Sequence, residues 1–202
     1  FPSISLYIKS MTVQVLYKNK DNANNVVLFV GEGFNISGLK KHMSHNEFSY
    51  VGDLLKKCNL NKNLLFFEVN SKKTIFLISI KKNLETSDIE SLGAEFHGYI
   101  NYNKKNDYSV NSDSISNKSE NFIGHFLHGL KLKSYEFNLY KSKKNTKLIS
   151  INVIGKKNKF TIKNELKFKA IEEGTFFARD LVSEPPNVLN PKEYVNRLLK
   201  LR

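Results

Sequence analysis

Apolar positions recur along the chain in two spacings, and together they predict an α/β fold. Alternating or continuous apolar runs, which are typical of strands, span residues 4–17 (one or two strands), 26–30, 64–69, 74–80, 135–140 and 148–154. Helical spacing marks residues 36–43, 51–57, 86–100 and 120–132. Because strands and helices are interleaved, we expect one α/β domain over roughly residues 1–160, with a mixed sheet of about six strands flanked by helices.

Local signals refine two of these elements. The runs 64–69 and 74–80 are joined by the polar turn 70–73, which predicts a hairpin whose second strand is interior. Thr86 or Ser87 is the expected cap of the helix 86–100. Between this helix and the next, residues 101–119 are rich in Asn and Ser and lack periodicity, so we expect a mobile low-complexity insertion there.

The end of the chain predicts a linker. Asn164 is the expected cap of a helix that Pro185 and Pro186 end shortly after Ser183. The predicted apolar face of this helix consists of Leu166, Ala170, Gly174, Phe177 and Leu181, broadened by Ile171, Ala178 and Val182. Asn190 then caps a second helix, which carries apolar residues at one side and has nothing downstream to face. We therefore expect a fragment: a linker at 164–190, and at 191–202 the first helix of a second domain.

Composition narrows the class of protein. A hydrophobic content of 40%, with 15 Phe and 9 Tyr, supports a folded core. The net charge of +13 invites a nucleic-acid partner, but Arg occurs only at Arg179, Arg197 and Arg202, and the lysines are scattered. This pattern is typical of a solvated surface and argues against nucleic acid as the main partner. The single Cys58 excludes an internal disulfide and fits a cytoplasmic protein, and no apolar run approaches a membrane span.

Two histidine pairs have a spacing that can share a metal ion: His42 with His45, and His125 with His128. Glu47 and Glu120 lie near them, yet neither pair matches a known metal motif, and packing or surface histidines are the default. Cys58 has neighbouring lysines, but a lone cysteine in a helical segment is more often a small buried hydrophobe.

Two other stretches carry functional alternatives. Gly31 and Gly33 follow a strand, where they form either a phosphate cradle or, as we expect from their spacing, a strand-to-helix turn. Arg179 and Asp180 form either an interdomain contact or an exposed helix pair, and the apolar flanks favour the contact. We assign no catalytic, cofactor-binding or metal-ligating residue in this chain.

The linker also carries a resemblance. Residues 176–194, FFARDLVSEPPNVLNPKEY, resemble the linker of the leucyl aminopeptidase (cytosol aminopeptidase) family, with its Ala-Arg-Asp-Leu run followed by Pro, Asn and the Pro that starts the next helix. Residues 129–137, GLKLKSYEF, are similar to the family's Gly-x-x-Leu-x-x-Tyr-x-Phe junction of helix and strand. The strand 74–80, followed by a helix, sits where the family has its central strand. Asn and Lys richness and the insertion 101–119 resemble a malaria-parasite member.

The resemblance implies the N-terminal, non-catalytic part of a metallo-aminopeptidase that releases N-terminal residues, leucine preferred, from peptides. It implies a macro-domain-like fold, a homohexamer, and two divalent ions (zinc, manganese or cobalt) held by a Lys, several Asp and a Glu of a C-terminal catalytic domain. None of these ligands maps onto this sequence. Some bacterial members also bind DNA. The alternative is a stand-alone macro-like module that binds a nucleotide near Gly31 and Gly33, or a nucleic acid.

Overall fold

The computed structural model describes residues 12–19, 24–103, 105–116, 121–142, 147–156 and 162–201. A six-stranded sheet has the order β1-β6-β5-β2-β4-β3. Its strands are β1 (Val13–Tyr17), β2 (Asn25–Gly31), β3 (Leu64–Glu68), β4 (Thr74–Ile80), β5 (Asp107–Asn111) and β6 (Ile149–Ile154). Neighbouring strands run parallel except in the β3–β4 hairpin, so the sheet is mixed, as predicted.

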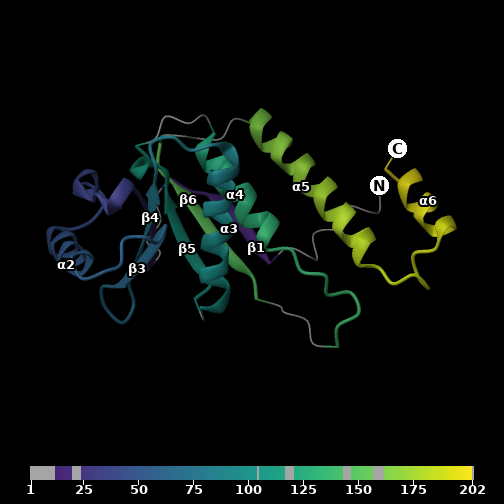
Figure 1. Ribbon diagram of the computed structural model, residues 1–202, viewed down its shortest axis with the longest axis horizontal. Helices are drawn as coiled ribbons and strands as arrows, with labels where there is room; N and C mark the ends of the chain where they lie inside the picture. The colour runs from purple at the N-terminus through teal and green to yellow at the C-terminus, as the bar shows by residue number, and fades with distance from the viewer. Residues whose placement is uncertain are drawn as a thin grey trace.

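Helices cover both faces of the sheet (Figure 1). They are α2 (His45–Leu55), α3 (Thr86–Tyr102), α4 (Phe122–Lys133), α5 (Ile162–Ser183) and α6 (Pro191–Leu199). Alternate residues of the strand β2 point to opposite faces: Leu28 and Val30 pack with α2, whereas Val27 and Phe29 pack with α3 and α4. The continuous apolar run of β2 thus reflects burial on both faces, as in other parallel sheets.

The helices α3 and α4 approach each other with their backbones nearly in contact. A Cβ atom added to Gly93 would lie 1.9 Å from the carbonyl oxygen of Phe126, and one added to Gly129 would lie 1.9 Å from that of Glu90. Only glycine leaves room for such an approach. The α3–α4 layer is therefore a tightly specified part of the molecule.

The predicted low-complexity insertion is wrong over most of its length. Helix α3 continues to Tyr102, and the strand β5 lies inside the sheet, paired with both β2 and β6. Tyr108, Ser109 and Val110 are fully or almost fully buried. A five-residue strand with paired backbone on both sides needs few apolar side chains, which is why its polar composition concealed it. Residues 104 and 117–119 of that stretch lie outside the described residues.

The predicted strand 135–140 is also wrong. Beyond a single bridge residue at Tyr135, the segment forms irregular and turn structure. Two of its aromatic side chains contact helix α5 or the residue just after it: the ring of Tyr135 stacks on Phe176, and Tyr140 donates a hydrogen bond to Glu184. Of the alternating residues, Tyr135 serves this helix contact, whereas Leu139 is 52% exposed and the ring of Phe137 lies against Tyr140.

Helix starts differ from the predictions by a few residues. Helix α2 begins at His45, six residues before the predicted 51–57, because Ser44 and Glu47 form a reciprocal capping box. The helical piece predicted at 36–43 is reduced to the 3₁₀ turn Ser37–Leu39. The cap of α3 is Glu85, paired with Asp88, and neither Thr86 nor Ser87. Of the strand predicted over 4–17, β1 is described and residues 4–11 lie outside the described part.

Candidate functional site

The candidate site is the junction at which helix α5 packs on α4 and on residues 132–140. Phe168, Glu172 and Phe176, spaced four residues apart, form the buried stripe of α5. The predicted apolar face is wrong: Leu166 is 62% exposed and Val182 is 87% exposed. The helix turns a charged residue inward because that residue finds partners there. Its start also differs, since the helix begins at Ile162, before the expected cap Asn164.

Glu172 is the centre of a buried polar cluster. Its side chain is 5% exposed, and its carboxylate accepts from Nδ1 of His128 at 3.2 Å and from Nζ of Lys131 at 2.9 Å. A buried carboxylate is tolerated when both its oxygens are paired in this way. The sequence held a signal that we missed, namely a glutamate flanked at four-residue spacing by Phe168 and Phe176.

The pair His125 and His128 does not form a shared metal site. Nδ1 of His125 lies 2.9 Å from Glu90 on helix α3, whereas His128 contacts Glu172 on α5. Both imidazole rings lie against the ring of Phe168, at centroid distances of 4.9 and 5.2 Å. The two histidines therefore tie α4 to its two neighbouring helices, which is the packing role given above as the default.

Arg179 and Asp180 bind the last turn of helix α4 and Tyr135, which follows it. Nη1 of Arg179 donates to the carbonyl oxygen of Leu132, and its guanidinium group lies 5.5 Å from the ring centroid of Tyr135. The hydroxyl of Tyr135 donates to Oδ1 of Asp180 at 2.6 Å. Arg179 and Asp180 thus form a built contact rather than an exposed pair. The stretches 129–137 and 176–194, which were singled out separately in the sequence, meet at this point.

Partial burial governs the titration of this contact. Burial, reinforced by the hydrogen bond to Asp180, raises the pKa of Tyr135 to about 12. Burial also raises the pKa of Asp180 above its ordinary value, with a further contribution from the nearby Glu184. The hydroxyl of Tyr135 consequently stays protonated, and able to donate, across the physiological range.

A second contact fixes the helix α6. The side chain of Glu184, just after α5, is 4% exposed and accepts from Tyr140 and from Nη1 of Arg197, the latter at 3.0 Å. Arg197 also pairs with Glu193 at 3.1 Å within α6. As predicted, Asn190 caps α6 with Pro191 at its first position. None of the described residues of α6 is buried, and Figure 1 shows the helix beyond the end of α5, away from the sheet.

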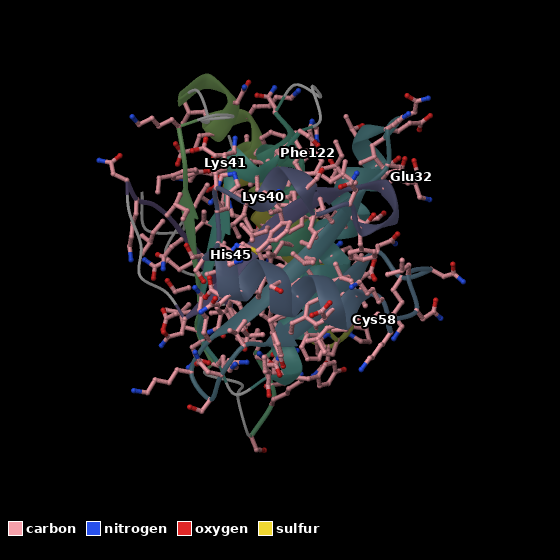
Figure 2. The ribbon with its side chains drawn as sticks, turned by 90° about the vertical axis from the view of Figure 1, so that its left-hand side faces the viewer. Glu32, Lys40, Lys41, His45, Cys58 and Phe122 are labelled. Atoms are coloured by element: carbon pink, nitrogen blue, oxygen red, sulfur yellow. The ribbon has the colours of Figure 1, made fainter. Side chains whose placement is uncertain are left out.

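The other sequence candidates lie around helix α2. Figure 2 looks onto this helix, with His45 beside Lys40 and Lys41, and Cys58 beyond its other end. His45 is exposed at the first position of α2, while Nδ1 of His42 lies 3.2 Å from Nδ2 of Asn111. Cys58 is half-buried and packs on the α2 side of the core, as expected of a small hydrophobe. Within the described ranges, no cluster of three or more His, Cys, Asp or Glu could hold a metal ion.

Gly31 and Gly33 form the predicted strand-to-helix turn. Gly31 ends β2, and its carbonyl oxygen accepts from the hydroxyl of Ser79 on the neighbouring strand β4. Gly33 has φ of 70° and Phe34 has φ of 58°, so the chain reverses through the left-handed region before reaching α2. Glu32, between the glycines, is exposed in Figure 2.

None of the helices in the described part of the chain combines the length and the apolarity needed to cross a bilayer.

Comparison with known proteins gives one consistent likeness. No protein-family profile matches the chain. A probable cytosol aminopeptidase of Agrobacterium fabrum is 36% identical over 83 residues, which are 38% of this chain and 17% of that protein. A probable cytosol aminopeptidase of Phytoplasma australiense is 29% identical over 142 residues, which are 69% of this chain and 29% of that protein. The chain therefore spans well under half of the relatives that it matches.

Solved structures show the same likeness in fold. A mutant of tomato leucine aminopeptidase superposes on 93% of this chain with a TM-score of 0.68 at 17% identity, over 42% of its own length. The bottromycin maturation enzyme BotP, in complex with Mn, superposes on 89% of this chain with a TM-score of 0.61 at 13% identity, over 36% of its own length. The chain is thus similar in sequence to cytosol aminopeptidases over part of its length, and its fold is that of the N-terminal domain of leucine aminopeptidases.

Proposed function

We propose that this chain is the N-terminal, non-catalytic part of a metal-dependent leucyl aminopeptidase, a hydrolase that releases N-terminal amino acids, leucine preferred, from peptides. The observation that carries the proposal is that one class of protein matches the chain twice, in sequence and in fold. The matched shares of those proteins leave most of their length beyond the part that this chain resembles.

In this proposal, residues 1–160 are the N-terminal domain, 164–190 are the linker, and 191–202 open the catalytic domain. The exposed apolar side chains of α6 support the assignment: Tyr194, Val195, Leu198 and Leu199 are each 39% or more exposed. An amphipathic helix gains stability only when its apolar face is covered. The chain's own catalytic domain is the partner that covers it.

The catalytic chemistry then belongs to residues outside this chain. Two divalent ions, zinc, manganese or cobalt, would polarise the scissile carbonyl and generate hydroxide there. The Mn complex of BotP supports a divalent metal in a protein of this fold. A cytoplasmic homohexamer is the expected assembly, and Lys and Asn richness supports a malaria-parasite type of member.

The test is an assay of the whole gene product and of this chain in parallel. We expect the whole protein, with zinc, manganese or cobalt, to cleave a leucyl reporter peptide and to lose activity with a chelator. The 202-residue chain should be inactive, and the reporter with an acetylated N-terminus should resist cleavage. A whole protein that stays inactive with all three metals would overturn the proposal.

A further inference from the structure

A cavity of about 200 Å³ opens between the edge strand β1, helix α4 and helix α5. Its apolar wall is formed by Val13, Val15, Leu127 and Phe168. Drug-sized ligands occupy pockets of about 300 Å³ or more, whereas each water molecule takes about 30 Å³. The cavity therefore suits an occupant much smaller than a nucleotide.

Charged side chains of both signs face this apolar wall. The ammonium group of Lys131 donates one of its three N–H groups to Glu172, so further donors remain for a ligand. Lys169 lies 4.0 Å from Glu173, at the outer limit of an ion pair, and its side chain is 64% exposed. No described residue forms an ion pair with Glu165. The cavity is thus lined by two ammonium groups, each already in an ion pair with a glutamate, by the paired carboxylate of Glu172, and by the carboxylate of Glu165, which has no ion-pair partner among the described residues.

The hydroxyl of Tyr17 completes the polar rim. Burial and the nearby carboxylates of Glu165 and Glu172 raise the pKa of Tyr17 to about 12. The phenol therefore remains neutral at physiological pH, and its oxygen can accept a hydrogen bond next to Glu165.

We infer that this cavity binds a free α-amino acid with an aliphatic side chain of about the size of leucine. Its carboxylate pairs with Lys131 and Lys169, its ammonium group pairs with Glu165 and the Tyr17 oxygen, and its side chain packs on Val15 and Leu127. A simple anion would meet Glu165, and a simple cation would meet the two lysines. The charged rim and the apolar wall together therefore select a zwitterion with an apolar side chain.

This inference stands on the cavity and does not rest on the proposed peptidase activity. Under that activity, the ligand would be the class of molecule that the reaction releases. Binding is measured on the 202-residue chain without turnover, so failure of the binding experiment leaves the peptidase assay intact, and the converse also holds.

The experiment is a calorimetric titration of the chain with four ligands: leucine, 4-methylpentanoate, 3-methylbutylamine and glycine. The first has both charges and the side chain, and each of the others lacks one of these. We expect saturable binding of one leucine per chain, with a Kd of about 1 mM or lower for a ligand of this size. Each truncated ligand should bind at least about tenfold more weakly, the usual effect of one charge-assisted hydrogen bond or one buried aliphatic group.

Matched variants assign the charges. Glu165→Gln should weaken leucine binding about tenfold and leave 4-methylpentanoate unchanged, while Glu173→Gln on the same helix changes neither. Lys169→Gln should weaken leucine and leave 3-methylbutylamine unchanged, with Lys167→Gln as its control. The inference is overturned if leucine shows no saturable binding, if the truncated ligands bind equally well, or if Glu165→Gln and Glu173→Gln behave alike.

Discussion

The α3–α4 layer and the α5–α6 junction solve the same problem, the attachment of helices to a folded unit, in opposite ways. Between the sheet, α3 and α4 the contact is apolar, with Phe96, Phe122 and Phe126 fully buried. At the junction the attachment relies on Glu172, Asp180 and Glu184, each paired with side chains from another segment.

The difference indicates what each region is for. Apolar close packing gives stability and one well-defined arrangement. Paired charges that are removed from water fix the orientation and register of the helices that carry them. They add less net stability than apolar packing does, because the cost of desolvation offsets much of their attraction. The junction therefore orients α5 and α6, while leaving apolar residues of both helices exposed, among them Leu166, Val182 and Leu199.

The largest effect is expected in the α3–α4 layer. Gly93→Ala forces a methyl group onto the backbone at Phe126, which a side-chain rearrangement cannot relieve. We expect a loss of about 3 kcal/mol or more in the free energy of unfolding, measured by urea denaturation. Gly98→Ala in the same helix meets no atom within 4 Å and should stabilise the chain by up to about 1 kcal/mol. Equal effects of the two substitutions would contradict the close approach.

The second largest loss in the free energy of unfolding is expected at the centre of the junction. Glu172→Gln leaves Lys131 without its buried counter-charge and His128 without a charged acceptor, and should cost about 2–3 kcal/mol. Glu173→Gln, one position along, removes an exposed charge and should cost under about 0.5 kcal/mol. Limited proteolysis should cut Glu172→Gln faster within α5 than within α3. Uniform protection of both helices would show that the two regions unfold together.

Most of the sheet and the α3–α4 layer could be predicted from the sequence, because the spacing of apolar residues along a strand or helix indicates which of its faces is buried. The strand β5 could not, because Ser109 is buried in backbone pairing that leaves no apolar signature. The strand expected at 135–140 failed for the converse reason: its apolar alternation does not report burial in a sheet, since Tyr135 packs on helix α5 and Leu139 is 52% exposed.

The junction shows the same limit more sharply. The turn at Pro185 and the cap at Asn190 could be predicted, since each depends on local chemistry. For Arg179 and Asp180 the sequence favoured a contact over an exposed pair, but their partners Leu132 and Tyr135 lie more than 40 residues away and were not predicted. The face of α5 could not, because Leu166 is exposed and Glu172 is buried only through partners more than 40 residues away in the sequence. Hydrophobicity alone cannot predict that a carboxylate with charged partners is buried while a leucine on the same helix stays exposed.

The free energy of unfolding, measured over a range of pH, tests the burial of a histidine in the α3–α4 layer. His97 of α3 is 4% exposed, and burial, with a contribution from Lys133, lowers its pKa. A base with a lowered folded-state pKa contributes stability that is present above its ordinary pKa of about 6.5 and is lost as pH falls. The free energy of unfolding should therefore decrease below about pH 6.5, by up to about 1.4 kcal/mol per pH unit. His97→Gln should remove that part of the slope, and a slope unchanged by the substitution would exclude His97 as its source.

The smallest effect is expected at the contact between Tyr135 and Asp180. Tyr135→Phe keeps the stacking on Phe176 and removes one hydrogen bond to a charged group, which costs about 1–2 kcal/mol at neutral pH. Because the folded-state pKa of Tyr135 is raised to about 12, its contribution is present below about pH 10 and is lost as pH rises to 12. The variant should therefore lose less stability than the parent chain across that interval. A double-mutant cycle with Asp180→Asn isolates the pair, and a coupling energy near zero would show that the hydrogen bond between Tyr135 and Asp180 does not stabilise the junction.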